Sequence, residues 1–508
     1  MSRTSNSLKN IATTIGGQML NNVLRLVCRT VFIHTLGKEY LGISSLYANI
    51  LTLLSLSELG FGTAITYSLY KPLVEKDEAT ICALMNFFKK SYRIIGVAIL
   101  LFGGCLIPFL PTLMNGTTDA VNIYLYYALY LVQTVVSYLF FAYKSVIIIA
   151  DQKKYINDTI TYIFQILMNT VQILILIFWK SFFLYTIVAI ANSIIQNIVV
   201  AYIADRKYPF LKNSGRKLSK EEKKDVFERV YAMSLYRIST VVGTATDNLI
   251  ISTNISVLFV GLYDNYYMII QVIQKLIQGF FQSFTSSLGN YYVLKSKEEN
   301  EFMFRCLNRL NSWMIVFCSV CFMALLQPFI TFWAGTEYLL EYSVVVVVVM
   351  NFATNFMQST VQIYKEASGL FVKGKYRAVM TAVLNLIISI ILVKKMGLAG
   401  VFLGSIISRL VTTWWYDAWL LYRYGFEKSP WKYYINCIVT IGLIFTMTYA
   451  IEWICIPLNA GLIITIIIKG IVAVLLVNTV YLLLYGKNEE CRYLYDKGKS
   501  IILKKIKK

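Results

Sequence analysis

The chain has 508 residues, of which 57% are hydrophobic and only 15% are charged, and its formal net charge is +21. Soluble domains are about half apolar and about a quarter charged, so this composition excludes an ordinary soluble protein and indicates a chain whose main solvent is the lipid bilayer. The positive charge does not require a nucleic-acid partner, because cytoplasmic loops of membrane proteins collect Lys and Arg, which attract anionic membrane lipids.

Apolar segments of about 20 residues recur along the chain, and each can cross the hydrocarbon core as a helix that satisfies its own backbone hydrogen bonds. The sequence predicts fourteen such helices, centred on 10–33, 41–70, 92–112, 121–142, 156–178, 182–204, 231–252, 257–290, 310–333, 342–364, 376–393, 397–421, 433–453 and 461–485. Since the first segment carries arginines, it is not typical of a cleavable signal peptide.

The distribution of Lys and Arg predicts the topology. With the N-terminus in the cytoplasm, the outer loops hold few of the 48 basic residues, namely Lys38, Lys180, Lys394 and Lys395, and most of the others fall in the inner loops. The positive-inside rule therefore predicts a multi-pass protein of the cytoplasmic membrane with both termini in the cytoplasm.

Short internal matches offset by about 220 residues indicate a repeat. They join 36–42 to 255–261, 154–155 to 375–376 and 193–195 to 405–407. The predicted fold is thus an all-α integral membrane protein with two pseudo-repeated six-helix lobes and two further helices. The predicted regions are an N-terminal lobe over 1–204, a cytoplasmic linker over 205–230, a C-terminal lobe over 231–422 and the last two helices with a basic tail over 423–508.

The first predicted helix carries two cations on one face. Arg25 and Arg29 are four residues apart, so both project from the same side of a helix, and Gln18, Asn21 and Asn22 lie nearby. Lipid would not accept such a surface, so we expect it to line water or protein. Two guanidinium groups at this spacing suit a phosphate or diphosphate, which arginine binds bidentately. Alternatively, each arginine is an internal lock paired with Glu58 or Asp247.

Other charges inside predicted helices are functional candidates because intramembrane charge costs several kcal/mol. Arg237, Lys275 and Arg409 could complete a cationic, substrate-binding cavity, although Arg237 could also reach the inner interface. The acidic residues Glu58, Asp247 and Asp264 are candidates for ion coupling or for counter-ions. The partner of Arg409 must come from another helix, because Asp417 lies too far along the same helix.

The sequence shows no arrangement typical of an enzyme. His34 is the only histidine, and the pair Cys318 and Cys321 has no second pair to complete a metal site. No catalytic motif or nucleotide-binding loop occurs, so we expect neither catalytic residues, nor a metal, nor a cofactor.

Several segments resemble bacterial polysaccharide-biosynthesis flippases of the Wzx type, which export O-antigen or capsule repeat units. The resemblance rests on Arg29–Gly42, Leu53–Gly62, Tyr67–Pro72, Glu366–Phe371, Asn385–Ser389 and Gly400–Gly404. These flippases belong to the multidrug/oligosaccharidyl-lipid/polysaccharide export superfamily, and the resemblance covers essentially the whole chain.

The resemblance implies a transporter of the bacterial inner membrane that moves undecaprenyl-diphosphate-linked oligosaccharide to the outer leaflet by alternating access. It implies that Arg25 and Arg29 hold the lipid diphosphate, and that H+ or Na+ and proteins of polysaccharide assembly are partners. The alternatives are an ion-coupled multidrug exporter and, from another class, a membrane glycosyltransferase or polysaccharide polymerase. Multidrug relatives use acidic groups to take cationic drugs, whereas the first helix here is basic.

Overall fold

The computed structural model describes residues 3–55, 61–114, 122–212, 216–368, 370, 375–456 and 461–506. These residues are almost entirely helical, and no strand occurs among them. The predicted all-α fold is therefore confirmed. The chain divides into two compact units, Met1–Gly261 and Leu262–Lys508.

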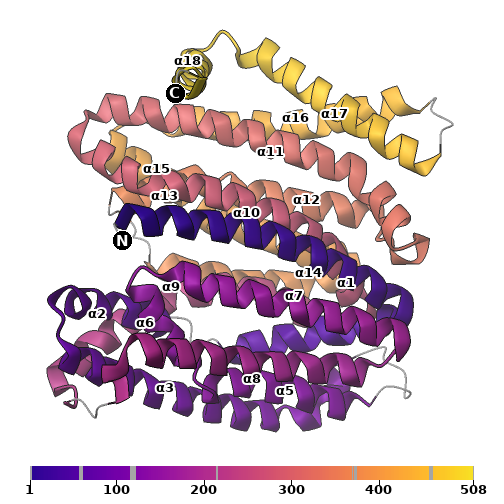
Figure 1. Ribbon diagram of the computed structural model, residues 1–508. Helices are drawn as coiled ribbons and strands as arrows, with labels where there is room; N and C mark the ends of the chain where they lie inside the picture. The colour runs from indigo at the N-terminus through magenta and orange to yellow at the C-terminus, as the bar shows by residue number, and fades with distance from the viewer. Residues whose placement is uncertain are drawn as a thin grey trace. The chain divides into compact units, whose positions relative to one another are not determined.

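The first unit is built on a long, bent first helix (Figure 1). Its helices are α1 (Arg3–Leu54), α2 (Phe61–Glu75), α3 (Glu78–Cys105), α4 (Leu110–Leu113), α5 (Ile123–Leu139), α6 (Ser145–Ala150), α7 (Lys154–Phe178), α8 (Phe182–Lys207) and α9 (Lys220–Asn254). Helix α1 lies along α7, and α9 packs against α1 and α2. The first compact unit consequently extends past residue 204, where the sequence places the end of the first lobe, and the six-helix duplication stays a prediction.

The second unit is organised around α11. Its helices are α10 (Val257–Leu294), which begins within the first unit, α11 (Lys297–Trp333), α12 (Tyr342–Phe356), α13 (Ser359–Ala367), α14 (Lys375–Arg409), α15 (Trp415–Leu421), α16 (Trp431–Cys455), α17 (Leu462–Tyr485) and α18 (Glu489–Ile506). Helix α11 packs against α12, α16, α17 and α18, and α12 packs against α14. Helix α15 lies between two π-helical segments, Leu410–Trp414 and Tyr422–Phe426.

Eight of the described helical segments are long and apolar enough to cross a membrane, or nine if the bent pair Ile123–Leu139 and Ala142–Ala150 is one span. The predicted number of fourteen is not confirmed by this measure. Helices α1, α9 and α10 are long, but they are not among these apolar segments. They include Arg25, Arg29, Asp247 and Asp264, so the same charges that mark functional candidates lower the apparent apolarity of these helices.

Two glycines bend helices that the sequence treats as separate spans. Gly37 has φ 80° inside α1 and Gly397 has φ 55° inside α14, a backbone region that side chains with a Cβ rarely adopt. The predicted helix 41–70 is divided between the second part of α1 and α2. The helices predicted at 376–393 and 397–421 join as α14 and its π-helical continuation.

The bend at Gly37 is followed by a close approach of two glycines. A Cβ on Gly42 would lie 2.2 Å from the carbonyl oxygen of Val257, and a Cβ on Gly261 would lie 2.7 Å from the backbone nitrogen of Gly42. Gly42 and Gly261 are paired by the internal match of 36–42 with 255–261. The two positions that the internal match aligns thus meet at one close backbone contact.

We expect Gly42→Ala to lower the free energy of unfolding by about 1–3 kcal/mol, because the added methyl group meets backbone rather than a flexible side chain. Gly104→Ala in α3 is the matched control, because no atom lies within 4 Å of the added Cβ. Alanine there should leave stability unchanged or raise it by about 0.5–1 kcal/mol. Thermal unfolding in detergent measures both variants, and equal stability of the two would contradict the close contact.

Candidate functional site

Helix α1 is held in the first unit by a face of small and amide residues. A Cβ on Gly17 would lie 2.2 Å from the ring of Tyr162, so α1 and α7 are in intimate contact at this point. One turn further, the amide of Asn169 donates to Asn21 Oδ1 at 3.4 Å. Cys28 and Phe32 continue this face and are each 3% exposed. The packing therefore fixes the rotation of α1 about its axis.

This rotation leaves the predicted cationic stripe accessible. Arg25 is exposed and Arg29 is half-buried. Leu20 and Val23, which are 52% and 60% exposed, point to yet another side of the helix, as expected for a surface that meets lipid. Helix α1 thus has a packed face, an apolar exposed face and, between them, a face with both arginines.

Aromatic hydroxyl groups surround the inner arginine. The charge of Arg29 acts on Tyr130 of α5, on Tyr185 of α8 and on the thiol of Cys28, so these groups are its electrostatic neighbours. The Tyr185 ring lies 5.2 Å from the ring of Phe32. Arg29 therefore lies near these side chains, while Arg25, one turn away, is more exposed. Because the two guanidinium groups share one face, they can both bind the same anionic group.

The remaining predicted site residues are spread over several helices. Asp247 is buried in α9, Asp264 is half-buried in α10, and Lys275 is exposed on α10. Glu58 and the side chain of Arg237 lie outside the described residues. The predicted cationic cavity of Arg25, Arg29, Arg237, Lys275 and Arg409, and the predicted coupling role of the three acidic residues, therefore stay predictions.

Arg409 has its partners on another helix, as the sequence predicts. Its guanidinium donates to the carbonyl oxygen of Asn351 at 3.1 Å, to Oδ1 of the same residue at 2.9 Å and to Thr354 Oγ1 at 3.0 Å. These bonds join α14 to α12. These three bonds to neutral oxygens orient the guanidinium of Arg409.

Sequence reasoning missed a buried ionic triad in the second unit. The carboxylate of Asp417 in α15 forms ion pairs with Lys365 of α13 and with Arg377 of α14, and the three side chains are 4%, 8% and 14% exposed. Arg377 also lies over the Tyr416 ring at 5.1 Å. Both cations lie at the ends of the predicted helices 342–364 and 376–393, where the positive-inside rule places basic residues in an inner loop. No local sequence pattern links Lys365 and Arg377 to Asp417.

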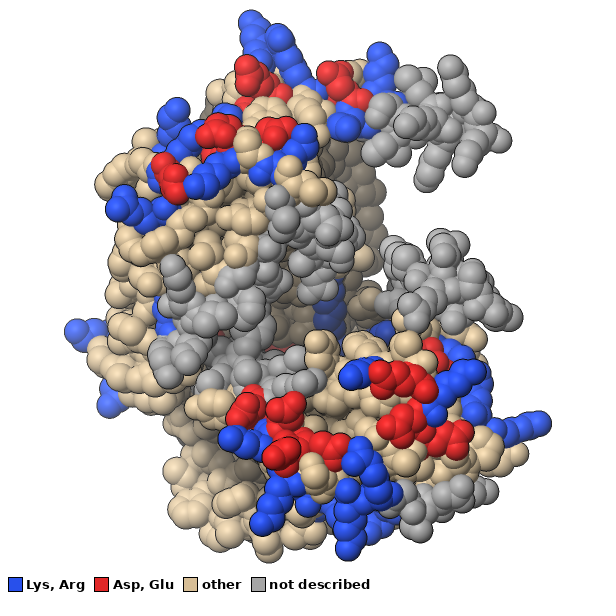
Figure 2. Space-filling model, turned by 90° about the vertical axis from the view of Figure 1, so that its left-hand side faces the viewer, with Lys and Arg blue, Asp and Glu red and all other residues tan. Residues whose placement is uncertain are grey.

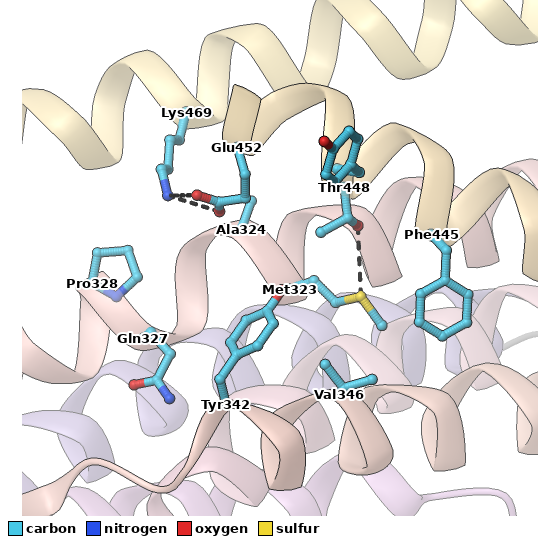
Figure 3. Close-up of a pocket in the computed structure, with 11 residues that line it drawn as sticks. Met323, Ala324, Gln327, Pro328, Tyr342, Val346, Phe445, Thr448, Glu452 and Lys469 are labelled. Atoms are coloured by element: carbon cyan, nitrogen blue, oxygen red, sulfur yellow. Dashed lines mark hydrogen bonds and ion pairs between the residues drawn. The ribbon is translucent and has the colours of Figure 1, made fainter. Parts of the chain in front are cut away.

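The sequence also did not predict an ion pair that lies in a pocket between α11, α12, α16 and α17 (Figure 3). Lys469 of α17 bonds to both carboxylate oxygens of Glu452 in α16, at 2.6 and 2.8 Å. The pocket has a volume of about 530 Å³, and Met323, Phe445 and Tyr342 are among the residues that line it. The charges neutralise each other in this apolar setting, so Lys469 is paired within the unit rather than extended toward the interface.

Metal binding finds no support in the described part of the chain, where no group of three or more His, Cys, Asp or Glu residues could hold an ion. The nine cysteines are all free thiols.

Solved structures similar to this chain are membrane transporters. The lipid II flippase MurJ in an inward closed conformation has a TM-score of 0.63 and 17% identity, over 93% of this chain and 99% of that chain. An inward-facing multidrug resistance MATE family transporter of the MOP superfamily has a TM-score of 0.62 and 16% identity, over 85% and 98%. A MOP superfamily transporter from Pyrococcus furiosus, described as having a binding pocket of reverse polarity, has a TM-score of 0.54 and 16% identity, over 84% of this chain and 98% of that chain.

These identities show the fold, which is that of the MATE and MurJ transporters. No curated protein matches the chain. The family described as polysaccharide biosynthesis protein matches residues 7–285, which is more than half of the sequence. The chain therefore belongs to the polysaccharide biosynthesis protein family, with a fold like that of the MATE and MurJ structures.

Proposed function

We propose that the protein is a flippase that moves an undecaprenyl-diphosphate-linked oligosaccharide from the inner to the outer leaflet of a bacterial cytoplasmic membrane. The observation that carries this proposal is the face of α1 with exposed Arg25 and half-buried Arg29, in a chain of the polysaccharide biosynthesis family. A diphosphate has oxygens for both guanidinium groups, and the tyrosines near Arg29 can bond to sugar hydroxyl groups.

The membrane potential gives such a cargo a direction. Moving one elementary charge across the membrane is worth about 2.3 kcal/mol per 100 mV. An anionic headgroup carried from the negative interior to the outside therefore moves down the potential, and binding to arginines offsets its loss of water on the way. Coupling to H+ or Na+, for which Glu58, Asp247 and Asp264 are the candidates, would add to this driving force.

A second candidate function is ion-coupled export of drugs, and the similarity in fold to a multidrug resistance MATE transporter favours it. A cationic drug would need acidic groups where it binds. The α1 face instead offers two cations, so an anionic cargo fits this chain better.

Deletion of the gene in its own host tests the proposal. The expected result is loss of the surface polysaccharide together with build-up of the lipid-linked precursor on the inner leaflet, and re-expression of the protein should reverse both. If the polysaccharide stays intact and drug sensitivity changes, the flippase proposal is wrong and the drug exporter takes its place. Loss of polymer without any lipid-linked precursor would instead point to a polymerase or glycosyltransferase.

A further inference from the structure

A cavity of about 690 Å³ opens at one end of the second unit. Its walls come from the first turns of α11, the start of α16, the π-helical segment before it and the first turn of α18. Four basic residues line it, namely Arg305, Arg309, Lys428 and Lys432, together with two acidic residues, Glu301 and Glu490. In Figure 2, Lys and Arg gather with Asp and Glu in the upper part of the view, over this end of the second unit.

The two carboxylates are used by two of the four cations. Arg305 pairs with Glu490 at 2.7 Å and with Glu301 at 3.2 Å, and Lys428 pairs with Glu301 at 3.1 Å. The side chains of Glu301 and Glu490 are only 12% and 11% exposed, so these pairs form the floor of the cavity. Arg309 and Lys432 have no carboxylate partner among the described residues, which leaves the cavity with two positive charges in excess.

Arg309 is held in place by neutral groups. One of its terminal nitrogens donates to Asn436 Oδ1 at 2.9 Å, and its guanidinium lies 3.8 Å from the centre of the Tyr485 ring. Its Nε is buried and has no acceptor among the described residues. A fixed arginine with an unused buried donor, in a cavity with excess positive charge, is ready to accept an anionic oxygen ligand.

The cavity lies where the charged end of the second unit meets its apolar surface. Trp431 lines the cavity and is 70% exposed, as is typical of an aromatic residue at the level of lipid headgroups. Within two turns along α16, Ile435 and Ile438 are 58% and 66% exposed. Leu482 and Leu483 near the end of α17 are 69% and 77% exposed. Acyl chains can therefore cover the surface beside a headgroup that occupies the cavity.

We propose that this cavity binds the phosphate of an anionic phospholipid, with Arg309 and Lys432 as its ligands. The neighbouring apolar residues favour a lipid over free phosphate, because a soluble anion would gain nothing from them. Bound lipid would bridge α11 and α16 beside the first turn of α18. The proposal depends on the membrane fold and not on the transported cargo.

The purified full-length protein tests the proposal in detergent by native mass spectrometry and thermal unfolding. The probes are short-chain phosphatidylglycerol, phosphatidylcholine of the same chain length, and inorganic phosphate. Wild type should bind phosphatidylglycerol several-fold more tightly than phosphatidylcholine. Arg309→Gln and Lys432→Gln should each weaken the binding of phosphatidylglycerol about fivefold. Lys71→Gln, which changes an exposed lysine of the first unit, should not.

Equal affinity of wild type and both cavity variants for phosphatidylglycerol would overturn the proposal. If millimolar inorganic phosphate displaces the lipid, and phosphate alone stabilises the protein as much as the lipid does, the cavity binds a soluble anion and the lipid proposal is wrong. If Arg309→Gln does not fold, Lys432→Gln and Arg309→Lys test the site instead. Lys432→Gln removes an exposed positive charge, whereas Arg309→Lys keeps the positive charge at position 309. Loss of binding in the former and retention in the latter support the site, and the reverse result refutes it.

Discussion

Replacing both Arg25 and Arg29 by alanine is expected to reduce transport of the lipid-linked oligosaccharide at least about a hundredfold. Each charge-assisted contact to a phosphate oxygen is worth about 1.5–3 kcal/mol, and the two arginines lie one helical turn apart on the same exposed face of α1. The initial rate of translocation of a fluorescent lipid-linked oligosaccharide in proteoliposomes measures the effect. In cells, precursor should accumulate while surface polymer is lost.

The single variants separate binding from structure. Arg25 is exposed, so Arg25→Ala should slow transport and leave thermal stability unchanged. Arg29 lies near Tyr130, Tyr185 and Cys28, so Arg29→Ala should lower both the transport rate and the thermal stability. Lys71→Ala, at an exposed lysine paired with Glu75 one turn away, is the control and should transport normally. An unchanged rate in the double variant would sink the idea that α1 holds a diphosphate.

The sequence predicts the class of fold because the bilayer imposes strong rules on composition. An apolar stretch that must satisfy its own backbone has to be a helix, and this holds for α7, α8, α16 and α17 with little change of bounds, whereas α11 begins at Lys297, well before the predicted 310. The stripe of Arg25 and Arg29 could also be predicted, because residues four apart share a face in any helix. Whether this face lines a path for substrate is a tertiary property that one helix does not encode.

Other features escape the sequence because they depend on three-dimensional partners. The pair of Glu452 and Lys469 joins neighbouring helices across a turn, and nothing local links the two residues. Lys365 and Arg377 flank a break between helices, where basic residues are expected to face the cytoplasm, yet both turn inward to one carboxylate. Helix α1 continues through the bend at Gly37 to Leu54, so it covers the predicted helix 10–33 and the first part of the predicted helix 41–70. Hydropathy alone treats these two segments as separate helices.

The triad around Asp417 leads to the largest expected change in stability. Asp417→Ala should lower the free energy of unfolding by about 3–5 kcal/mol, because it leaves two buried cations without their shared anion. Glu427→Ala is the matched control. It also removes the partner of a lysine, Lys297, but both side chains of that pair are more than half exposed, so it should cost about 1 kcal/mol or less. Unfolding in mixed micelles of rising denaturant content compares the two variants.

The position of Asp417 gives this prediction a further consequence. Helix α15 carries the carboxylate between π-helical segments on either side, and such segments often mark functional strain in a helix. If the triad holds these turns in place, Asp417→Asn should also increase amide hydrogen exchange over 410–426, while exchange over α16 stays unchanged. Equal loss of stability in Asp417→Ala and Glu427→Ala, with normal exchange in Asp417→Asn, would show that the two buried cations are solvated locally and that the triad contributes no net stability.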